Sequence, residues 1–388
     1  MARTQIKIYT LYGVIFLSVY SLFGQTDFEK YLKEQEDAIG LMIEDQNRYL
    51  ENVTIEFDEY KVEQDRLLQA FKDDVEKKWG EFKTSSSKIY VDYDENLNAR
   101  GSIDFEKGEI EIEVIVEDES DKSSVEKNNN GEEKLQKKLT QMVTKKADDK
   151  KPLLKDQLKN KHGQTVTKKN VRLFAKETVK DKKIKKEKFI SKDGKKRIKY
   201  TIKVKLLPNH LETRASLFKK DVSKYSKRWK IDPAVTFAVM HTESTFNPNA
   251  RSPVPAYGLM QLVPKTGARD AYNYVHKKDK LLTRKYLFVP EHNIELGCAY
   301  LSLIRYRYFS RIKNDESALY CTISAYNTGV GNVAKAFTGK TKLKATAAKV
   351  NTMNPEQVYK TLTKKLPYKE TRKYLDNVTN RMDIYKSW

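Results

Sequence analysis

A single glutamate, Glu243, lies near the end of a segment that is otherwise mostly apolar. The pair Asp232-Pro233 predicts a helix start, because aspartate is favoured at the N-cap and proline at the first helical position. The predicted helix, Pro233–Thr245, must end before Asn247-Pro248, since the residue that precedes a proline avoids the α region. A helix that is apolar on nearly every side is normally buried. The sequence therefore predicts a carboxylate at the C-terminal end of a buried helix.

A carboxylate in this position suits general-acid chemistry. Burial disfavours its charged form, and the negative end of the helix dipole acts in the same direction, so both raise the pKa of Glu243. A raised pKa keeps a carboxylic acid protonated near neutral pH, as a general acid requires. The alternative, which this segment alone leaves open, is a glutamate that is held by a partner or exposed at the helix end.

Metal and cofactor sites are not indicated by the sequence. His241 lies close to Glu243 but lacks the second histidine of a zinc motif, and no His, Cys and Asp cluster has ligand spacing. Gly329-Val330-Gly331 is a poor match to a phosphate-binding loop, because no strand is predicted before it. We therefore expect neither a metal nor a cofactor.

Four short motifs resemble those of the soluble lytic transglycosylase family. Within residues 207–388 they follow the family's order as Glu243-Ser244-Thr245-Phe246-Asn247-Pro248, Gly258-Leu259-Met260-Gln261, Ala325-Tyr326-Asn327-Thr328-Gly329 and Pro367-Tyr368-Lys369-Glu370-Thr371-Arg372-Lys373-Tyr374. The spacing between the first two motifs also matches. Four motifs in the right order make this a specific resemblance.

One branch of the family, the membrane-bound lytic murein transglycosylases C, is especially similar. The run Gly297–Ile304 resembles a helix of that branch, and the stretch Tyr90–Val116 resembles part of its N-terminal domain. Three departures stand out. No lipidation cysteine follows the N-terminal apolar run, Pro255 stands where the family often has glycine, and Thr328 replaces a small residue.

The resemblance implies a lysozyme-like catalytic domain and a reaction that needs one carboxylate, whereas most glycosidases use two. Glu243 would protonate the oxygen between N-acetylmuramic acid and N-acetylglucosamine. It would then take the proton of the muramoyl C6 hydroxyl, which closes on C1 and leaves a 1,6-anhydro end without consuming water. Two rival functions are a lysozyme-type hydrolase, which uses water, and a catalytically inactive peptidoglycan-binding protein.

The family also implies supporting residues in the second motif. Gln261 and Ser252 would hydrogen-bond sugar groups near the cleavage point. Met260 would line the floor of the cleft, and Gly258 would let the backbone approach the sugar. A methionine taken by itself is more typical of a core than of a cleft.

The third and fourth motifs contribute four further residues. Tyr326 would stack or hydrogen-bond beside Glu243, and Asn327 would hold the loop or a sugar. Glu370 and Tyr374 are one helical turn apart, so they can act together from the opposite wall. A glutamate in a first helical turn is, however, often only a surface residue favoured by the helix dipole.

The elements that position these residues predict an α+β N-terminal domain followed by an all-α, lysozyme-like catalytic domain. Upstream, a charged helical pattern runs from Phe28 to about Trp79, and alternating runs at Ile89–Tyr93, Ile103–Phe105 and Ile110–Val116 predict a three-stranded meander. Ile198–Val204 predicts a fourth strand. Residues 117–151 form a loop or the approach to a helix at 132–143, with Asn128–Gly131 least structured. The basic block Asp181–Lys199 is typical of a solvated face or tail.

Helices account for the rest of the chain. They are predicted at Leu211–Trp229, Pro233–Thr245, Leu259–Tyr274, Ile294–Phe309, Glu316–Tyr326, Pro355–Lys364 and Pro367–Asp383. The predicted organisation is a signal peptide over residues 1–25, an α+β domain over 26–206 and a catalytic domain over 207–388. Pro208 marks the boundary between the two domains.

Targeting and charge predict an exported protein. Arg3 and Lys7 precede the apolar run Ile8–Phe23, as in a secretory signal, although an uncleaved anchor is the alternative. The formal net charge of +22 indicates attraction to polyanions. After export to the periplasm these would be anionic cell wall or membrane lipid, not nucleic acid, or else the lysines only keep the chain soluble. Cys298 and Cys321 favour two buried thiols, with a disulfide as the alternative.

Overall fold

The computed structural model describes residues 33, 62–63, 65–118, 123–147, 150–252 and 255–388. The chain divides into two compact units, residues 1–71 and 72–388, and the elements below belong to the second. The predicted signal peptide lies outside the described residues, as does most of the helical pattern that begins at Phe28. Of that pattern, residues 65–79 are helical. The domain boundary between residues 206 and 207 stays a prediction.

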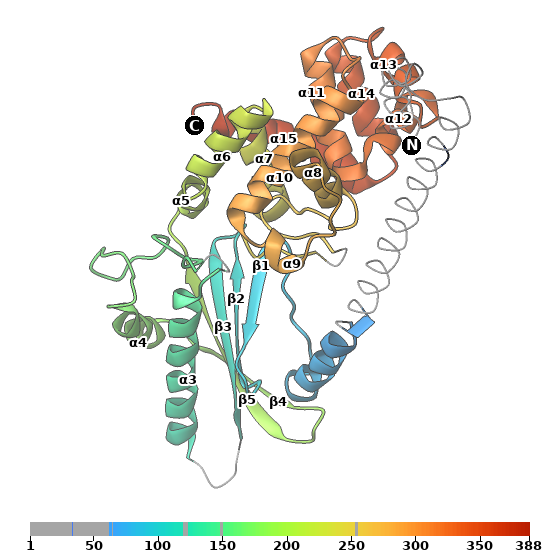
Figure 1. Cartoon of the computed structure of the whole chain (residues 1–388). Helices are drawn as coiled ribbons and strands as arrows, with labels where there is room; N and C mark the ends of the chain where they lie inside the picture. Colours follow the sequence, from blue (N-terminus) through green and yellow to red (C-terminus); the bar gives the residue numbers. More distant parts are fainter. Residues whose placement is uncertain (1–32, 34–61, 64, 119–122, 148–149, 253–254) are drawn as a thin grey trace, which may run out of the picture. The chain divides into compact units, whose positions relative to one another are not determined.

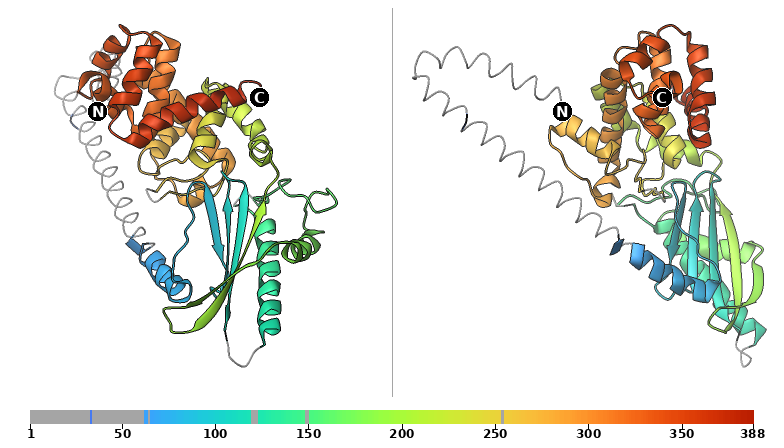
Figure 2. Two further views of the ribbon diagram at one scale, coloured as in Figure 1. Left: turned by 180° about the vertical axis from the view of Figure 1, so that it is seen from behind. Right: turned by 90° about the vertical axis from the view of Figure 1, so that its right-hand side faces the viewer.

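A five-stranded antiparallel sheet forms the N-terminal part of the second unit (Figure 1). In sheet order its strands are β1 (Ile89–Tyr93), β2 (Ala99–Asp104), β3 (Glu109–Glu117), β5 (Lys196–Lys205) and β4 (Lys185–Ile190). The predicted meander and the predicted fourth strand, β5, are confirmed. Both faces of the sheet are covered. Alternate residues of β3 pack with α3 (Ser124–Thr144) and α4 (Val171–Asp181), and Ile115 packs with Val75 and Trp79 on the opposite face (Figure 2).

Strand β4 and the start of β5 lie in the basic block that the sequence indicates as a solvated face or tail. The two strands are joined by a tight turn in which Gly194 has φ of +81° and Arg197 donates two hydrogen bonds to the carboxylate of Asp193. The interpretation as a solvated face agrees with the structure, because the lysine side chains of β4 are exposed, but strand β4 itself was not predicted. Lysines on an edge strand also oppose pairing with another chain.

Helix α3 begins earlier than predicted. Ser123 and Glu126 form a capping box, which starts the helix at Ser124 and carries it through Asn128–Gly131, the stretch predicted to be least structured. A Cβ atom on Gly131 would lie 2.9 Å from the ring of Tyr200, so this glycine lets the helix approach the sheet closely. The helix α4 was not predicted.

The C-terminal part is helical, as predicted, and in the described residues of 207–388 strand pairing is confined to isolated bridges. Its elements are α5 (His210–Ser216), α6 (Lys219–Trp229), α7 (Pro233–Ser244), α8 (Gly267–His276), α9 (Arg284–Leu287), α10 (Pro290–Leu303), the π-helical turn η1 (Ile304–Tyr308), α11 (Asp315–Thr328), α12 (Val330–Thr338), α13 (Leu343–Val350), α14 (Pro355–Lys365) and α15 (Lys369–Tyr385). Helix α7 is buried as predicted and packs against α15 and α6.

Two helix predictions need correction. The predicted helix Leu211–Trp229 is two helices, α5 and α6, and the predicted helix Leu259–Tyr274 starts only at Gly267. Gly258 and Gln261 have φ of +79° and +46°, so this segment turns before it can become helical. Helices α12 and α13 were not predicted.

Two smaller findings concern the cysteines and the membrane. Cys298 and Cys321 are both buried free thiols, which is the favoured of the two interpretations. Within the described part of the chain, no helix has the length and apolar character that a membrane span requires.

Candidate active site

Helix α7 carries Glu243 into the middle of the helical part. Asp232 caps its start by accepting a hydrogen bond of 2.8 Å from the backbone N–H of Ala234, and Pro233 occupies its first turn. The helix ends at Ser244, one residue before the predicted end, because Thr245 adopts a left-handed conformation. Ser244 is anchored by its hydroxyl, which donates to the carbonyl oxygen of Leu259 at 2.8 Å.

Glu243 and Tyr374 meet across the site. The Tyr374 hydroxyl on α15 donates a hydrogen bond of 2.7 Å to Oε1 of Glu243. Glu243 keeps a small exposed edge, yet burial of its carboxylate raises its pKa to about 7. The Tyr374 hydrogen bond opposes this rise, the negative charge of Glu370 adds to it, and the positive charge of Lys88 opposes it. A carboxyl group that titrates near neutral pH can both give and take a proton there.

The segment that carries the second motif lies against α10. Asn293 holds it: its Oδ1 accepts from the backbone N–H of Met260 at 2.8 Å, and its Nδ2 donates to the carbonyl oxygens of Tyr257 and Leu287 at 2.9 and 2.8 Å. A Cβ on Gly258 would collide with Asn293 and with the carbonyl oxygen of Leu287. Sequence reasoning missed Asn293, because its burial is seen only in the structure.

The structure brings Met260 and Tyr326 together beside Glu243. The Tyr326 hydroxyl donates to the Met260 carbonyl oxygen at 2.8 Å. Burial raises the pKa of Tyr326, and the negative charge of Glu243 adds to this rise. Met260 is fully buried, with its side chain against Gly297, so this side chain is not open to a substrate. Gln261 donates its side-chain amide to the carbonyl oxygens of Ala250 and Gly258 at 3.1 and 3.0 Å, which fixes the side chain.

Several predicted residues, Gln261 among them, remain at least partly open to solvent. Ser252 and Asn327 are partly exposed, and Glu370 is exposed at the start of α15, one turn from Tyr374. Tyr374 and Glu370 therefore both act on Glu243, the first through a hydrogen bond and the second through its charge. Their contacts with a sugar stay predictions.

Sequence reasoning also missed that residues of the N-terminal part contact the loop next to Glu243. Residues 84–88, which lead into β1, approach the loop after α7: the Asn247 side chain donates to the carbonyl oxygen of Ser87 at 3.3 Å, and Arg251 donates to the Thr84 hydroxyl at 3.2 Å. The next residue, Lys88, forms a 2.5 Å ion pair with Glu106 and lowers the pKa of Glu243. No local motif signals a contact between such distant segments.

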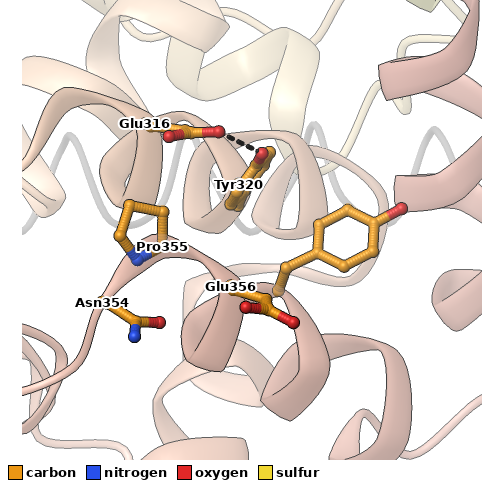
Figure 3. Close-up of a pocket in the computed structure, with 6 residues that line it drawn as sticks. Glu316, Tyr320, Asn354, Pro355 and Glu356 are labelled. Atoms are coloured by element: carbon orange, nitrogen blue, oxygen red, sulfur yellow. Dashed lines mark hydrogen bonds between the residues drawn. The ribbon is translucent and has the colours of Figure 1, made fainter.

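A surface pocket of about 440 Å³ lies elsewhere, between α11 and α14 (Figure 3). Its lining residues are Glu316, Tyr320, Asn354, Pro355, Glu356 and Tyr359. None of the predicted site residues is among them, and the Tyr320 hydroxyl is already bonded to Glu316 at 2.5 Å. In the described residues, no group of three or more His, Cys, Asp or Glu side chains is arranged to hold a metal ion.

Comparisons with known proteins agree on one family. The Transglycosylase SLT domain matches residues 221–349, and the N-terminal domain of membrane-bound lytic murein transglycosylase C matches residues 44–217. Membrane-bound lytic murein transglycosylase C from Salmonella arizonae is 32% identical over 83% of this chain and 89% of that protein, and the one from Pectobacterium atrosepticum is 31% identical over 83% and 90%. The crystal structure of a 70-kDa soluble lytic transglycosylase from Escherichia coli is 26% identical over 46% of this chain and 25% of that one, with a TM-score of 0.34.

Proposed function

The chain belongs to the membrane-bound lytic murein transglycosylase C family, and from that membership we propose that Glu243 is the acid and base of its reaction. It is an enzyme, a peptidoglycan lytic transglycosylase that acts in the cell envelope. The observation that carries the proposal for Glu243 is its carboxyl group at the end of a buried helix, with a pKa raised to about 7 and a hydrogen bond from Tyr374.

In the proposed reaction Glu243 first donates a proton and then accepts one. Protonated Glu243 gives its proton to the oxygen that links N-acetylmuramic acid to N-acetylglucosamine, and the bond from that oxygen to C1 breaks. The carboxylate then accepts the proton of the muramoyl C6 hydroxyl as that oxygen bonds to C1. Glu243 ends protonated, so the cycle needs neither water nor a second carboxylate. A pKa near 7 suits both steps, because neither protonation state is strongly disfavoured.

The supporting roles are proposed from the hydrogen bonds at the site and from the family motifs. Tyr374 stabilises the charged form of Glu243 by donating to it, and Tyr326 fixes the Met260 carbonyl beneath the site. We assign Ser252, Gln261, Asn327 and Glu370 to sugar contacts, since each lies in a motif of the family and is at least partly exposed. Gly258 and Met260 shape the backbone under the sugar.

The finer setting is also proposed. We assign the helical part a lysozyme-like fold, and we place the protein in the periplasm at the cell wall or outer membrane. The net charge of +22 supports attraction to anionic wall or lipid, with peptidoglycan strands as the substrate. Export removes the protein from nucleic acid.

Digestion of purified peptidoglycan tests the proposal for Glu243. The wild-type protein is expected to release 1,6-anhydromuropeptides, identified by mass spectrometry, and the Glu243→Gln variant is expected to release none. Reducing-end products from the wild type would instead establish a hydrolase. If neither protein released products while both bound peptidoglycan, the chain would be a binding protein.

A further inference from the structure

The two residues that follow helix α7 adopt an unfavourable backbone conformation. Thr245 and Phe246 have φ of +50° and +60°. Residues other than glycine rarely occupy this left-handed region, and for a β-branched residue such as threonine it is a genuine outlier. Strained residues of this kind persist only where the surrounding structure holds them, and they cluster at functional sites. This turn begins two residues after Glu243, so a contact that fixes the turn also fixes the position of the Glu243 carboxylate.

The buried side chain of Arg214, on α5, joins this turn to the N-terminal sheet. Its Nε donates to the carbonyl oxygen of Thr245 at 3.2 Å, and its Nη2 donates to the carbonyl oxygen of Phe105, just after β2, at 2.7 Å. Its Nη1 donates to Oε1 of Gln157 at 2.7 Å and lies 3.0 Å from Nδ1 of His210. The guanidinium carbon also lies 5.0 Å from the centre of the Phe105 ring.

Stability alone is a poor reason for this arrangement. Arg214 is 1% exposed, and all four of its hydrogen-bond acceptors are neutral, because burial also lowers the pKa of His210 to about 4. Burial likewise lowers the pKa of Arg214 to about 9, which reflects the cost of placing its charge there. A buried charge whose partners are all neutral carries a desolvation cost that its hydrogen bonds offset only in part. The arrangement therefore points to a requirement for this particular geometry.

We propose that Arg214 is a positioning residue, which fixes the left-handed turn Thr245–Phe246 to the N-terminal sheet and thereby holds Glu243 in place for the reaction. This inference rests on the proposed role of Glu243. A second contact supports it, because Asn247, the next residue of the loop, donates to the carbonyl oxygen of Ser87. The segments that flank β1 and β2 thus hold the loop after Glu243 at two points.

The test compares Arg214→Met with Gln157→Met in the full-length protein. Arg214→Met keeps an unbranched side chain but removes every donor, whereas Gln157→Met removes one acceptor of the same guanidinium and leaves its bond to Thr245. At a temperature where circular dichroism shows both variants folded, Arg214→Met is expected to lower kcat by about tenfold or more with little change in KM, because small displacements of a catalytic group are costly. Gln157→Met is expected to keep a kcat close to that of the wild type.

A rescue variant separates positioning from a general loss of structure. Asparagine occupies the left-handed region far more readily than threonine and has a similar volume. Adding Thr245→Asn to Arg214→Met is therefore expected to recover part of the lost kcat. An unchanged kcat in Arg214→Met, or equal losses in both single variants with no recovery by Thr245→Asn, would overturn the inference. A wild-type protein that released no anhydromuropeptides would overturn the proposed function instead.

Discussion

The hydroxyl of Tyr374 donates a 2.7 Å hydrogen bond to Oε1 of Glu243 across 131 residues of sequence. Tyr374 is buried on α15 and Glu243 lies in the last turn of α7, so the contact depends on the packing of these two helices. The bond favours the carboxylate, whereas burial favours the neutral acid. Their balance places the pKa of Glu243 at about 7, and with the proposed role of Glu243 activity should fall as pH rises through this value.

Replacing Tyr374 with phenylalanine removes this hydrogen bond and keeps the ring. Because the bond lowers the pKa of Glu243, its loss raises that pKa, by on the order of one pH unit for a bond to a charged group. The acid must be protonated at the start of the reaction, so the basic limb of the kcat/KM profile moves to higher pH. Initial rates of anhydromuropeptide release between pH 5 and pH 9 measure the shift. An unmoved limb would show that Tyr374 does not act on the acid.

Glu370→Gln is expected to move the basic limb of the kcat/KM profile to lower pH. The negative charge of Glu370 raises the pKa of Glu243, so its removal lowers that pKa and activity falls at a lower pH. Because Glu370 is exposed, the shift should be small and should shrink at high ionic strength. Asp383→Asn, another exposed acid on α15, is the matched control and should leave the profile in place. A limb that moves equally in both variants would contradict a specific effect.

The raised pKa of Glu243 also has a consequence for stability. The folded protein binds this proton more tightly than the unfolded chain, where the ordinary value is 4.5, so the protein loses stability as pH rises from about 4.5 to about 7. Glu243→Gln removes this loss. At pH 8 the variant should therefore have a higher Tm than the wild type, and its free energy of unfolding should be higher by at most about 3 kcal/mol. At pH 4 the two proteins should have equal Tm values. Thermal melts at the two pH values test this, and a pH-independent difference would contradict it.

Local sequence signals were enough to place Glu243. Asp232-Pro233 and the apolar run behind it fix the start and burial of α7, and the alternating runs fix the meander of the sheet. Strand β4 was not predicted, because its backbone pairs with β5 while its lysine side chains stay in water, so no alternating apolar pattern marks it. The turn after Gly258 was not predicted, because the spacing of apolar residues carries no information about the two positive φ angles in this segment.

The residues that hold the site in place were not predicted, for a different reason. Arg214, Asn293 and Lys88 act through partners that are distant in sequence, such as Thr245 for Arg214. Hydrogen bonds of this kind depend on tertiary packing, which one sequence without its relatives does not display. Burial is the usable clue, because a charged or amide side chain placed in an apolar core needs partners there.

Gly258 is the residue whose substitution should damage the site most directly. Its φ is +79°, and an added Cβ would collide with the carbonyl oxygen of Leu287 and the side chain of Asn293. Gly339 is a matched control, because its φ is +69° but no atom lies within 4 Å of the added Cβ. Gly339→Ala should therefore show only the cost of the left-handed backbone, about 1 kcal/mol.

Gly258→Ala carries that same cost together with the collision, for a total of roughly 2–4 kcal/mol. The collision also displaces the segment whose Met260 N–H and carbonyl oxygen bind Asn293 and Tyr326, so kcat should fall well below that of Gly339→Ala at a temperature where both are folded. Thermal melts and rates of anhydromuropeptide release measure the two effects separately. Equal Tm losses with wild-type kcat in both variants would mean that the backbone at Gly258 is free to move, and that the second motif is not held against α10 as the structure has it.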